Sequence, residues 1–342
     1  MAGPYYCDPA GSNTSPYDTW AKGATSIQTV LDLALAGEII YCRGTQTLAA
    51  QIDVDTQTGT NAAGWIKVIG CNASGNVDGT RFILNGNNYG GNIVLASATS
   101  DMYWLENVEV KNTGVGDYGG FVATSGTSGW VFLNCCVNNC GGDGFDAPNF
   151  AQSIFIRCVA YLNTGRGFDG PAFCVFCASR DNTGSGFLVG ATTVLIGCIS
   201  HGNTDDGAAT TSSGAGLLFN CVADGNGDDG VYISTSTQTY GIRILGCRIT
   251  NHSGAGDIGL NANSEPCITG WCYFEDNDGD NIQNAAVHNF IPAEGGSTTS
   301  NVEDQADTDE GYVDKANHDF STDYTDGTDP SLRRTAITIP WE

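Results

Sequence analysis

The chain has 342 residues, of which 47 are glycine, and its 38 acidic against 13 basic residues give a net charge of -25. A chain of this length can bury a substantial core as one large domain or two ordinary ones. Its negative field argues against nucleic acid and anionic membrane as partners. Abundant glycine and the lack of long amphipathic stretches predict an all-β chain with many turns.

The first fifty residues predict a cap and a first strand. MAGPYYCDPAG has neither a basic nor an apolar signal-peptide region, and no segment reaches the length of a membrane helix. We therefore expect no signal peptide, no membrane insertion and synthesis in a cytoplasm. SIQTVLDLALAG, over residues 26–37, is apolar at helical spacing, with serine at its start and glycine at its end. It predicts a helix that caps the open end of the following repeats, whose first strand starts at EIIYCRG.

A repeat of 19 to 26 residues follows, and it is aligned by cysteine at 135, 158, 177, 198, 221, 247 and 272. An apolar residue lies two positions before most of these cysteines, and asparagine lies five positions after most of them. A period of this length, with short strands and Gly/Asn turns, is typical of a solenoid. Because no crossover helices separate the strands, we expect a parallel β-helix in which each repeat forms one coil.

The β-helix explains the cysteines without disulfides. Equivalent residues of neighbouring coils lie parallel and ~4.8 Å apart, too far and wrongly aimed for unstrained bridges. We therefore expect a column of reduced, buried thiols. Cys174 and Cys177, and likewise Cys135 and Cys136, are expected to point to opposite faces of a strand, which excludes zinc chelation by either pair. The recurrent asparagines predict an amide ladder along the turns.

The repeat pattern ends near residue 285. Residues 293–311 are acidic and polar, as in a linker. The last stretch, SLRRTAITIPWE, joins Arg333 and Arg334 to an apolar strand with Trp341, which is expected to fold back or to dock on a neighbouring chain. The predicted organisation is a cap over 1–50, coils over 51–285 and an acidic C-terminal extension over 286–342.

These segments carry a resemblance. YYCDPAG, the helix TSIQTVLDLALAGEIIYCRGT and the repeated C-Φ-x-x-x-N-x-x-x-G-Φ coils resemble right-handed parallel β-helix proteins of the pectin lyase-like superfamily, over roughly residues 4–285. The tail GYVDKANHDFSTDYTDGTDPSLRR resembles the closing segment of β-helix proteins from bacteriophage and environmental sequences. The resemblance implies a right-handed single-stranded parallel β-helix. It implies no single activity, because the superfamily contains lyases, glycosidases, epimerases, adhesins and tailspikes.

One column of the repeat carries the candidate site, eight positions after the cysteine: Asp143, Arg166, Ser185, Asp206, Asp229, Ala255 and Asp280. Asp205 and Asp228 precede two of its members. NTDDG followed by GDDG is similar to the polygalacturonase pattern, and this resemblance implies acid and base roles for Asp205, Asp228 and Asp229, with His252 one coil further on. The Arg-Ile-Lys and Gly-His of that family are absent here. The alternative is that the aspartates are turn residues on a solvated edge.

Two functions follow. The first is a non-enzymatic structural or binding protein of a virus particle, a capsid decoration or tail protein, which forms a homotrimer and contacts other virion proteins, a host or a glycan. Trp104, Phe132 and Phe155, expected on outward strand positions, would then form an interface or lie under the C-terminal tail. The alternative is a carbohydrate-active enzyme, a glycoside hydrolase or polysaccharide lyase, using Asp205, Asp206, Asp228 and Asp229. For a lyase, the mid-chain candidate bases are Arg166 and Arg180. No metal or cofactor is assigned.

Overall fold

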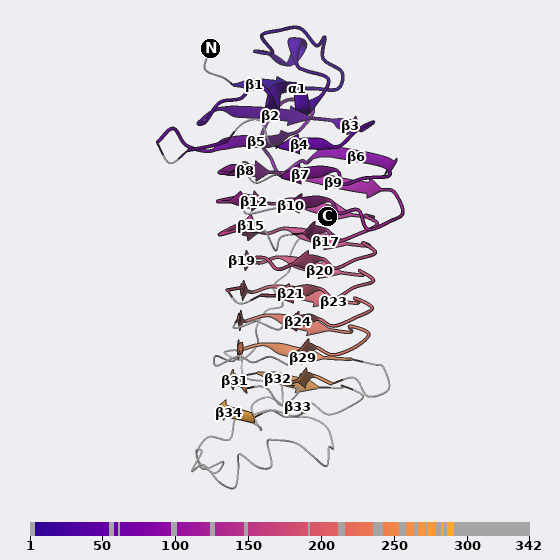
Figure 1. Cartoon of the computed structure of the whole chain (residues 1–342), viewed down its shortest axis with the longest axis vertical. Coiled ribbons are helices and arrows are strands. Elements are labelled where there is room, and N and C mark those ends of the chain that lie inside the picture. Colours follow the sequence, from indigo (N-terminus) through magenta and orange to yellow (C-terminus); the bar gives the residue numbers. More distant parts are fainter. Residues whose placement is uncertain are drawn as a thin grey trace. The chain divides into compact units, whose positions relative to one another are not determined.

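Within each unit, after the first strand of the chain, the strands of the three main sheets follow one another in the repeating order A, B, C (Figure 1). The structure is a computed structural model and describes residues 4–54, 58–60, 62–96, 101–123, 127–146, 150–190, 192–210, 216–234, 242–252, 258–262, 266–270, 272–275, 277, 282–283 and 286–290. Ala255, Asp280 and the C-terminal stretch with Arg333, Arg334 and Trp341 lie outside this range. The chain divides into two compact units, Met1–Leu188 (unit 1) and Val189–Glu342 (unit 2).

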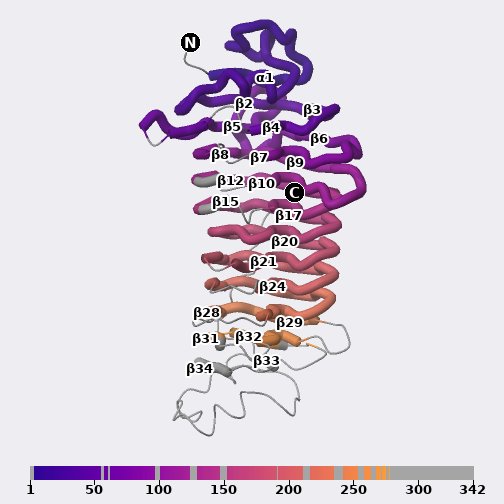
Figure 2. The backbone as a smooth tube through the Cα atoms, viewed as in Figure 1, coloured from indigo at the N-terminus to yellow at the C-terminus, as the bar shows by residue number. Residues whose placement is uncertain are grey.

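Unit 1 forms a parallel β-helix whose strands stack in chain order (Figure 2). Sheet A comprises β1 (Tyr5–Cys7), β2 (Ile39–Arg43), β5 (Ile66–Cys71), β8 (Tyr103–Glu106), β12 (Val131–Leu133), β16 (Ile154–Ile156) and β19 (Phe173–Val175). Sheet B comprises β3 (Thr45–Thr47), β6 (Phe82–Tyr89), β9 (Val108–Thr113), β13 (Cys136–Asn138), β17 (Val159–Tyr161) and β20 (Ala178–Arg180). Sheet C comprises β4 (Ile52–Val54), β7 (Val94–Ala96), β10 (Phe121–Ala123), β14 (Phe145–Asp146), β18 (Phe168–Asp169) and β21 (Phe187–Val189). A short pair, β11 (Thr127–Ser128) and β15 (Phe150–Ala151), lies outside these sheets.

Unit 2 repeats the arrangement. Sheet A comprises β22 (Val194–Ile196), β25 (Leu217–Phe219), β28 (Ile242–Leu245), β31 (Pro266–Gly270) and β34 (Ala286–Phe290). Sheet B comprises β23 (Ile199–His201), β26 (Val222–Asp224), β29 (Arg248–Thr250) and β32 (Tyr273–Glu275). Sheet C comprises β24 (Ala208–Thr210), β27 (Val231–Tyr232), β30 (Leu260–Asn261) and β33 (Ile282–Gln283). The predicted all-β parallel solenoid is confirmed, whereas the domain boundaries at 50 and 285 stay predictions.

The N-terminal segment is less helical than expected. The predicted helix over 26–37 is reduced to α1 (Ile27–Leu31), five residues long, after a single 3-10 turn, η1 (Trp20–Lys22). Ser26 makes no side-chain capping bond to α1. The helix buries Ile27, Val30 and Leu31, while Leu33 and Leu35 beyond it remain exposed. Its role as a cap of the solenoid is not confirmed.

Phenylalanine rings fill much of the interior of unit 1. Phe132 stacks on Phe155 with ring centroids 4.7 Å apart, and Phe145 stacks on Phe168 at 4.8 Å. The prediction that Phe132 and Phe155 point outward is therefore wrong, because both rings are fully buried. Where it is described, the residue before an aligned cysteine has a positive φ and forms the turn from sheet A to sheet B, and it breaks the strand alternation on which that prediction relied.

The same turn places the cysteines. All fourteen are free and buried, as expected for a column of reduced thiols. In unit 1 the Sγ of Cys158 donates to the Phe132 carbonyl of the preceding coil at 3.4 Å, and Cys177 does the same to Phe155 at 3.4 Å. The expectation that Cys174 and Cys177 point to opposite faces is wrong, because Phe176, with φ 53°, lies between them and both thiols face the core.

The predicted asparagine ladder is present within each unit. In unit 1, the Nδ2 of Asn163 donates to the Oδ1 of Asn182 at 3.0 Å. In unit 2, the Nδ2 of Asn203 donates to the Oδ1 of Asn226 at 2.9 Å. These side chains are buried, so the ladder satisfies polar groups at the turns between sheets B and C.

Candidate functional site

The candidate aspartates lie in the turns between sheets B and C of unit 2. Asp205 and Asp206 lie between β23 and β24, and Asp228 and Asp229 lie at the equivalent place between β26 and β27. Each pair is followed by a glycine where neighbouring coils come close: a Cβ on Gly207 would lie 2.5 Å from the Gly230 carbonyl oxygen. Glycine is required there because no side chain fits between the coils.

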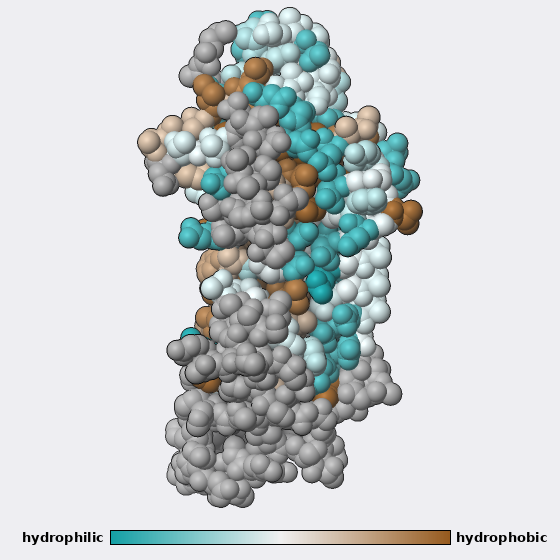
Figure 3. Space-filling view, viewed as in Figure 1, coloured by the Kyte–Doolittle hydropathy of each residue, from teal (hydrophilic) through white to brown (hydrophobic). Residues whose placement is uncertain are grey.

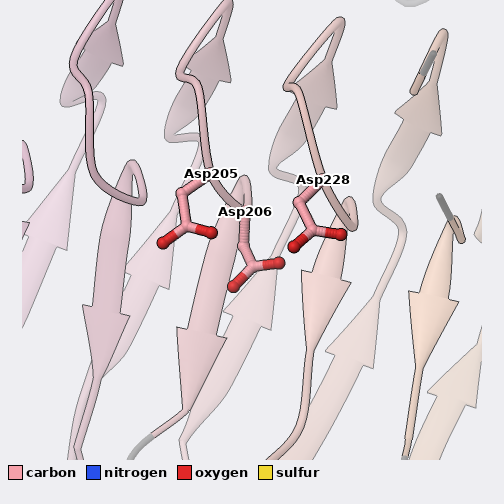
Figure 4. A group of neighbouring side chains, drawn as sticks. All are labelled: Asp205, Asp206 and Asp228. Carbon is pink, nitrogen blue, oxygen red and sulfur yellow. The ribbon is translucent and has the colours of Figure 1, made fainter. Parts of the chain in front are cut away.

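Three of the carboxyl groups converge. One oxygen each of Asp205, Asp206 and Asp228 lies within 4.8 Å of the others, and their side chains point toward a common space (Figure 4). Asp205 and Asp228 are exposed, whereas Asp206 is 6% exposed. The aspartates are therefore not all on a solvated edge, because the second member of each pair is buried.

Burial first, and then the negative charges of Asp205, Asp228 and Asp229, raise the pKa of Asp206 to about 8. The backbone N–H of Asp229, which donates to the Oδ1 of Asp206 at 3.2 Å, acts in the opposite direction. Asp206 is therefore protonated at neutral pH, and it lies beside exposed carboxyl groups.

Asp229 is held by the neighbouring coil. Its Oδ1 accepts from the Ile258 backbone N–H at 2.9 Å, and its Oδ2 accepts from the Asn261 side chain at 2.9 Å. Asp229 is only 4% exposed and lies in the turn that carries Asp228. Its backbone N–H donates to Asp206. Both carboxyl oxygens of Asp229 therefore accept hydrogen bonds from the next coil.

His252 is fully buried in the turn after β29. Its backbone N–H donates to the Oδ1 of Asn277 at 3.3 Å, and its Nδ1 lies 3.4 Å from the Asn226 carbonyl oxygen. These are the contacts of a ladder residue, since His252 occupies the asparagine position of its coil. His252 is not part of the group that Asp205, Asp206 and Asp228 form.

Unit 1 carries a second group of charged residues at the equivalent turns. Asp143 accepts a short hydrogen bond from the Arg166 backbone N–H, and the Arg166 guanidinium pairs with Asp169 at 3.2 Å. Asp146 lies directly opposite Asp169 on neighbouring strands of sheet C. Burial, with the charges of Asp169 and Asp143 next, raises the pKa of Asp146 to about 7, and burial raises that of Asp143 to about 6.

Sequence reasoning found Asp143 and Arg166 but missed Asp146 and Asp169. The available signal was the repeated Gly-Phe-Asp, which occurs one coil apart at 144–146 and 167–169. A strand of two residues that buries its phenylalanine must direct the following aspartate outward. Arg180, the other candidate base, lies over the Tyr161 ring at 4.7 Å and pairs with Asp181.

The three converging oxygens of unit 2 also fit a hard divalent cation. Calcium binds carboxylate oxygens at ~2.3–2.6 Å, so two ligands of one ion lie at most ~5 Å apart. The 4.8 Å spread of the Asp205, Asp206 and Asp228 oxygens satisfies this limit. In the part of the chain that the structure describes, no other group of three Asp, Glu, His or Cys side chains brings its ligand atoms this close together.

No protein-family model matches the chain, and no curated protein matches it. Solved structures do. A pectate lyase, Pel9A, is similar with a TM-score of 0.68 and 17% identity, over 90% of this chain and 84% of that one. A rhamnogalacturonan lyase has a TM-score of 0.54 at 15% identity, over 81% and 74%. The A-module of the Azotobacter vinelandii mannuronan C-5 epimerase AlgE4 has 0.50 at 15% identity, over 78% and 91%.

At these identities the likeness shows the fold alone. Together with the stacked parallel strands it shows a parallel β-helix similar in fold to these three structures. None of the helices in the described residues is long and apolar enough to cross a membrane.

Proposed function

We propose that the chain is a carbohydrate-active enzyme that cleaves a polysaccharide at the converging aspartates of unit 2. The observation that carries the proposal is the buried, protonated carboxyl of Asp206 within 4.8 Å of the exposed carboxyl groups of Asp205 and Asp228. A buried carboxyl with a raised pKa beside exposed carboxyl groups is an arrangement suited to general acid and base catalysis. The described fold supports this choice, since the three similar structures are all of enzymes named for polysaccharides.

In this mechanism Asp206 donates its proton to the glycosidic oxygen as the bond to the anomeric carbon breaks. A carboxylate oxygen of Asp205 or Asp228 attacks the anomeric carbon, and water later hydrolyses the glycosyl ester while Asp206 takes up the proton of that water. The close approach of the carboxyl groups favours this two-step route, because retaining enzymes separate theirs by ~5–5.5 Å and inverting enzymes by ~6.5–9.5 Å. Asp229, held by Ile258 and Asn261, keeps the turn in place.

The test is turnover on a panel of neutral and acidic polysaccharides, measured as new reducing ends. Asp206→Asn is expected to lower the rate by ~100-fold or more, because general acid catalysis contributes roughly that factor. The exposed Asp181→Asn in unit 1 serves as the matched control and is expected to retain the wild-type rate. If Asp206→Asn cleaves at the wild-type rate, the aspartate group does not catalyse the cleavage.

A second candidate is a lyase or epimerase that acts on an acidic polysaccharide with a divalent cation. It is favoured by the fit of the Asp205, Asp206 and Asp228 oxygens to calcium and by the names of the similar structures. The bound cation would neutralise the uronate carboxylate and acidify the adjacent C–H. The three aspartates would be its ligands, and in a protein of net charge -25 they would otherwise repel an anionic polymer.

Calcium and a chelator separate the two candidates. Lyase cleavage requires the cation and yields unsaturated uronate, which is detected by its ultraviolet absorbance. Hydrolysis proceeds without the cation and yields reducing ends with no unsaturated uronate. Cleavage that a chelator leaves unchanged, with no unsaturated product, would rule out the cation-dependent candidate. Epimerisation would appear as a changed uronate composition without shorter chains.

The virion role expected from the sequence is the weaker proposal. None of the three similar structures is described as a virion protein, and the findings favour the enzymatic alternative. A homotrimer with other virion proteins as partners would still be compatible with enzymatic cleavage of a host glycan. The native mass of the full chain in solution tests the oligomer: a trimeric mass supports it, and a monomer at all concentrations counts against it.

A further inference from the structure

Sheet A of unit 1 carries aromatic and charged side chains on its outward face. In register across β2, β5 and β8, the outward positions form two columns, one with Ile39, Lys67 and Trp104, the other with Tyr41, Ile69 and Glu106. These side chains are half-buried, while the alternate residues on the same strands face the core. Trp65 lies directly before β5, and its ring contacts Trp104 of the first column.

The contacts hold Trp104 in a defined orientation. The Trp65 ring packs edge-on against it with centroids 6.3 Å apart and planes at 90°. The Lys67 ammonium lies over the Trp104 ring, 5.5 Å from its centroid, and the Trp104 Nε1 donates to the Oε2 of Glu106 at 3.1 Å. The surface thus combines two indole rings with one ammonium donor and one carboxylate acceptor within reach of them.

This combination matches the chemistry of a sugar ring. A pyranose has a face of C–H groups, which packs on the electron-rich face of an indole, and a rim of hydroxyls, which both donate and accept hydrogen bonds. Lys67 offers donors for such hydroxyls, and Glu106 offers acceptors. A partner with an apolar protein surface would bury the indole rings against aliphatic groups. It would leave the charges of Lys67 and Glu106 without partners of matching polarity. Figure 3 shows apolar residues on the visible surface as separate brown areas among hydrophilic ones.

We propose that Trp65, Lys67, Trp104 and Glu106 form a glycan-binding surface in unit 1, separate from the aspartate group of unit 2. Its ligand is a polysaccharide chain whose pyranose rings stack on the indoles. Along sheet A, neighbouring coils repeat every ~4.8 Å, close to the length of one sugar residue, so successive rings of one chain reach successive strands. The surface holds the polymer and performs no chemistry, so it goes beyond the proposed cleavage and does not depend on it.

The test is affinity electrophoresis of the full chain through native gels that contain dextran, polygalacturonate or alginate. At least one polymer is expected to retard the wild-type chain. Trp104→Ala is expected to weaken that retardation by about tenfold, since an aromatic contact of ~1.4 kcal/mol corresponds to that factor. Glu106→Gln and Lys67→Met, which keep the size of each side chain, are expected to weaken it several-fold and serve as readouts if Trp104→Ala does not fold.

The matched control is Phe176→Ala, at an exposed aromatic in the turn between β19 and β20 of unit 1. It is expected to run like the wild-type chain in every gel. Retardation that is equal in Trp104→Ala, Lys67→Met, Glu106→Gln and wild type overturns the proposal, and so does the absence of retardation by all three polymers. Asp206→Asn is expected to be retarded like the wild-type chain. A failure of the cleavage proposal can therefore be told apart from a failure of the glycan-binding proposal.

Discussion

Asp206 and Asp229 occupy equivalent positions of neighbouring coils, yet their carboxyl groups have different partners. Asp229 accepts two hydrogen bonds from the next coil, through Ile258 and Asn261. Asp206 accepts the backbone N–H of Asp229 and lies among the negative charges of the group. The difference arises because each turn is stacked on the next one, so the chemistry of an aspartate depends on the residue that follows it one coil later.

This difference predicts a dependence of stability on pH. Because the pKa of Asp206 is raised to about 8 in the folded chain, the folded state binds this proton more tightly than the unfolded state does. The resulting stability is fully present below the ordinary carboxyl pKa and is lost as pH rises through about 8. Asp206→Asn is expected to raise the free energy of unfolding at about pH 9 by at least ~1 kcal/mol.

The measurement is urea unfolding of wild type and Asp206→Asn at about pH 5 and about pH 9. The gain from the substitution is expected at the higher pH and is expected to shrink at the lower one. Asp32→Asn, at an exposed position in unit 1, provides the control. A substitution effect that is equal at both pH values would show that the raised pKa has no consequence for folding.

At the scale of the element, each short strand gains its stability from the coils on either side. Strands of two or three residues have little intrinsic stability, and their side chains pack mainly on the equivalent residues of neighbouring coils. The phenylalanine stacks of unit 1 and the asparagine pairs of both units are such contacts. Substitutions in these columns are therefore expected to be costly, while those at the exposed turns are not.

The asparagine ladder provides one such prediction. Asn203 donates through its Nδ2 to the Oδ1 of Asn226 and to the Oγ of Ser200, both at 2.9 Å. Asn203→Ala removes these donors from a buried site, and the expected loss in the free energy of unfolding is ~1–3 kcal/mol. Thr204→Ala, at the exposed neighbouring position, is expected to change it by less than ~0.5 kcal/mol. Chemical denaturation of both variants decides, and equal losses would contradict the ladder.

Phe155 tests the inward orientation of the aromatic stack. Its ring is fully buried on Phe132, so Phe155→Ala is expected to lower the free energy of unfolding by ~3–5 kcal/mol. Phe176→Ala, at a ring that is 38% exposed, is expected to cost less than ~1 kcal/mol. The comparison is made by thermal unfolding of the two variants. A small loss for Phe155→Ala would indicate that this side chain points outward, as the sequence alternation predicted.

At the scale of the whole molecule, thiol chemistry follows from burial. All fourteen cysteines are buried, and burial raises the pKa of thiols such as Cys135, Cys158 and Cys221 well above the ordinary value. A buried thiol with a raised pKa forms little thiolate and reacts slowly. We expect a colorimetric thiol reagent to modify few cysteines in the native chain at neutral pH and all fourteen after denaturation. Rapid modification of most thiols in the native chain would contradict the packed column.

Much of the fold could be predicted because a β-helix repeats its own contacts. A cysteine that recurs every 19 to 26 residues, with asparagine five positions later, indicates which residues stack, and the free thiols and amide pairs follow from that alignment. The pairing of Asp205–Asp206 with Asp228–Asp229 on neighbouring coils was predictable for the same reason. The extent of α1 was not, because helical spacing does not reveal that the chain turns away after Leu31.

Only the tertiary structure decided which way side chains point and how deeply they are buried. A single turn residue with positive φ between sheets A and B reverses the alternation, so Phe155 faces the core where strand periodicity alone indicated the surface. The hydrogen bonding of Asp229 depends on Ile258 and Asn261, roughly thirty residues further along the chain. By itself, the sequence determined the alignment of the coils, because that depends on residue type and spacing. The tertiary structure decided solvation and partners, because these depend on what each coil places over the next.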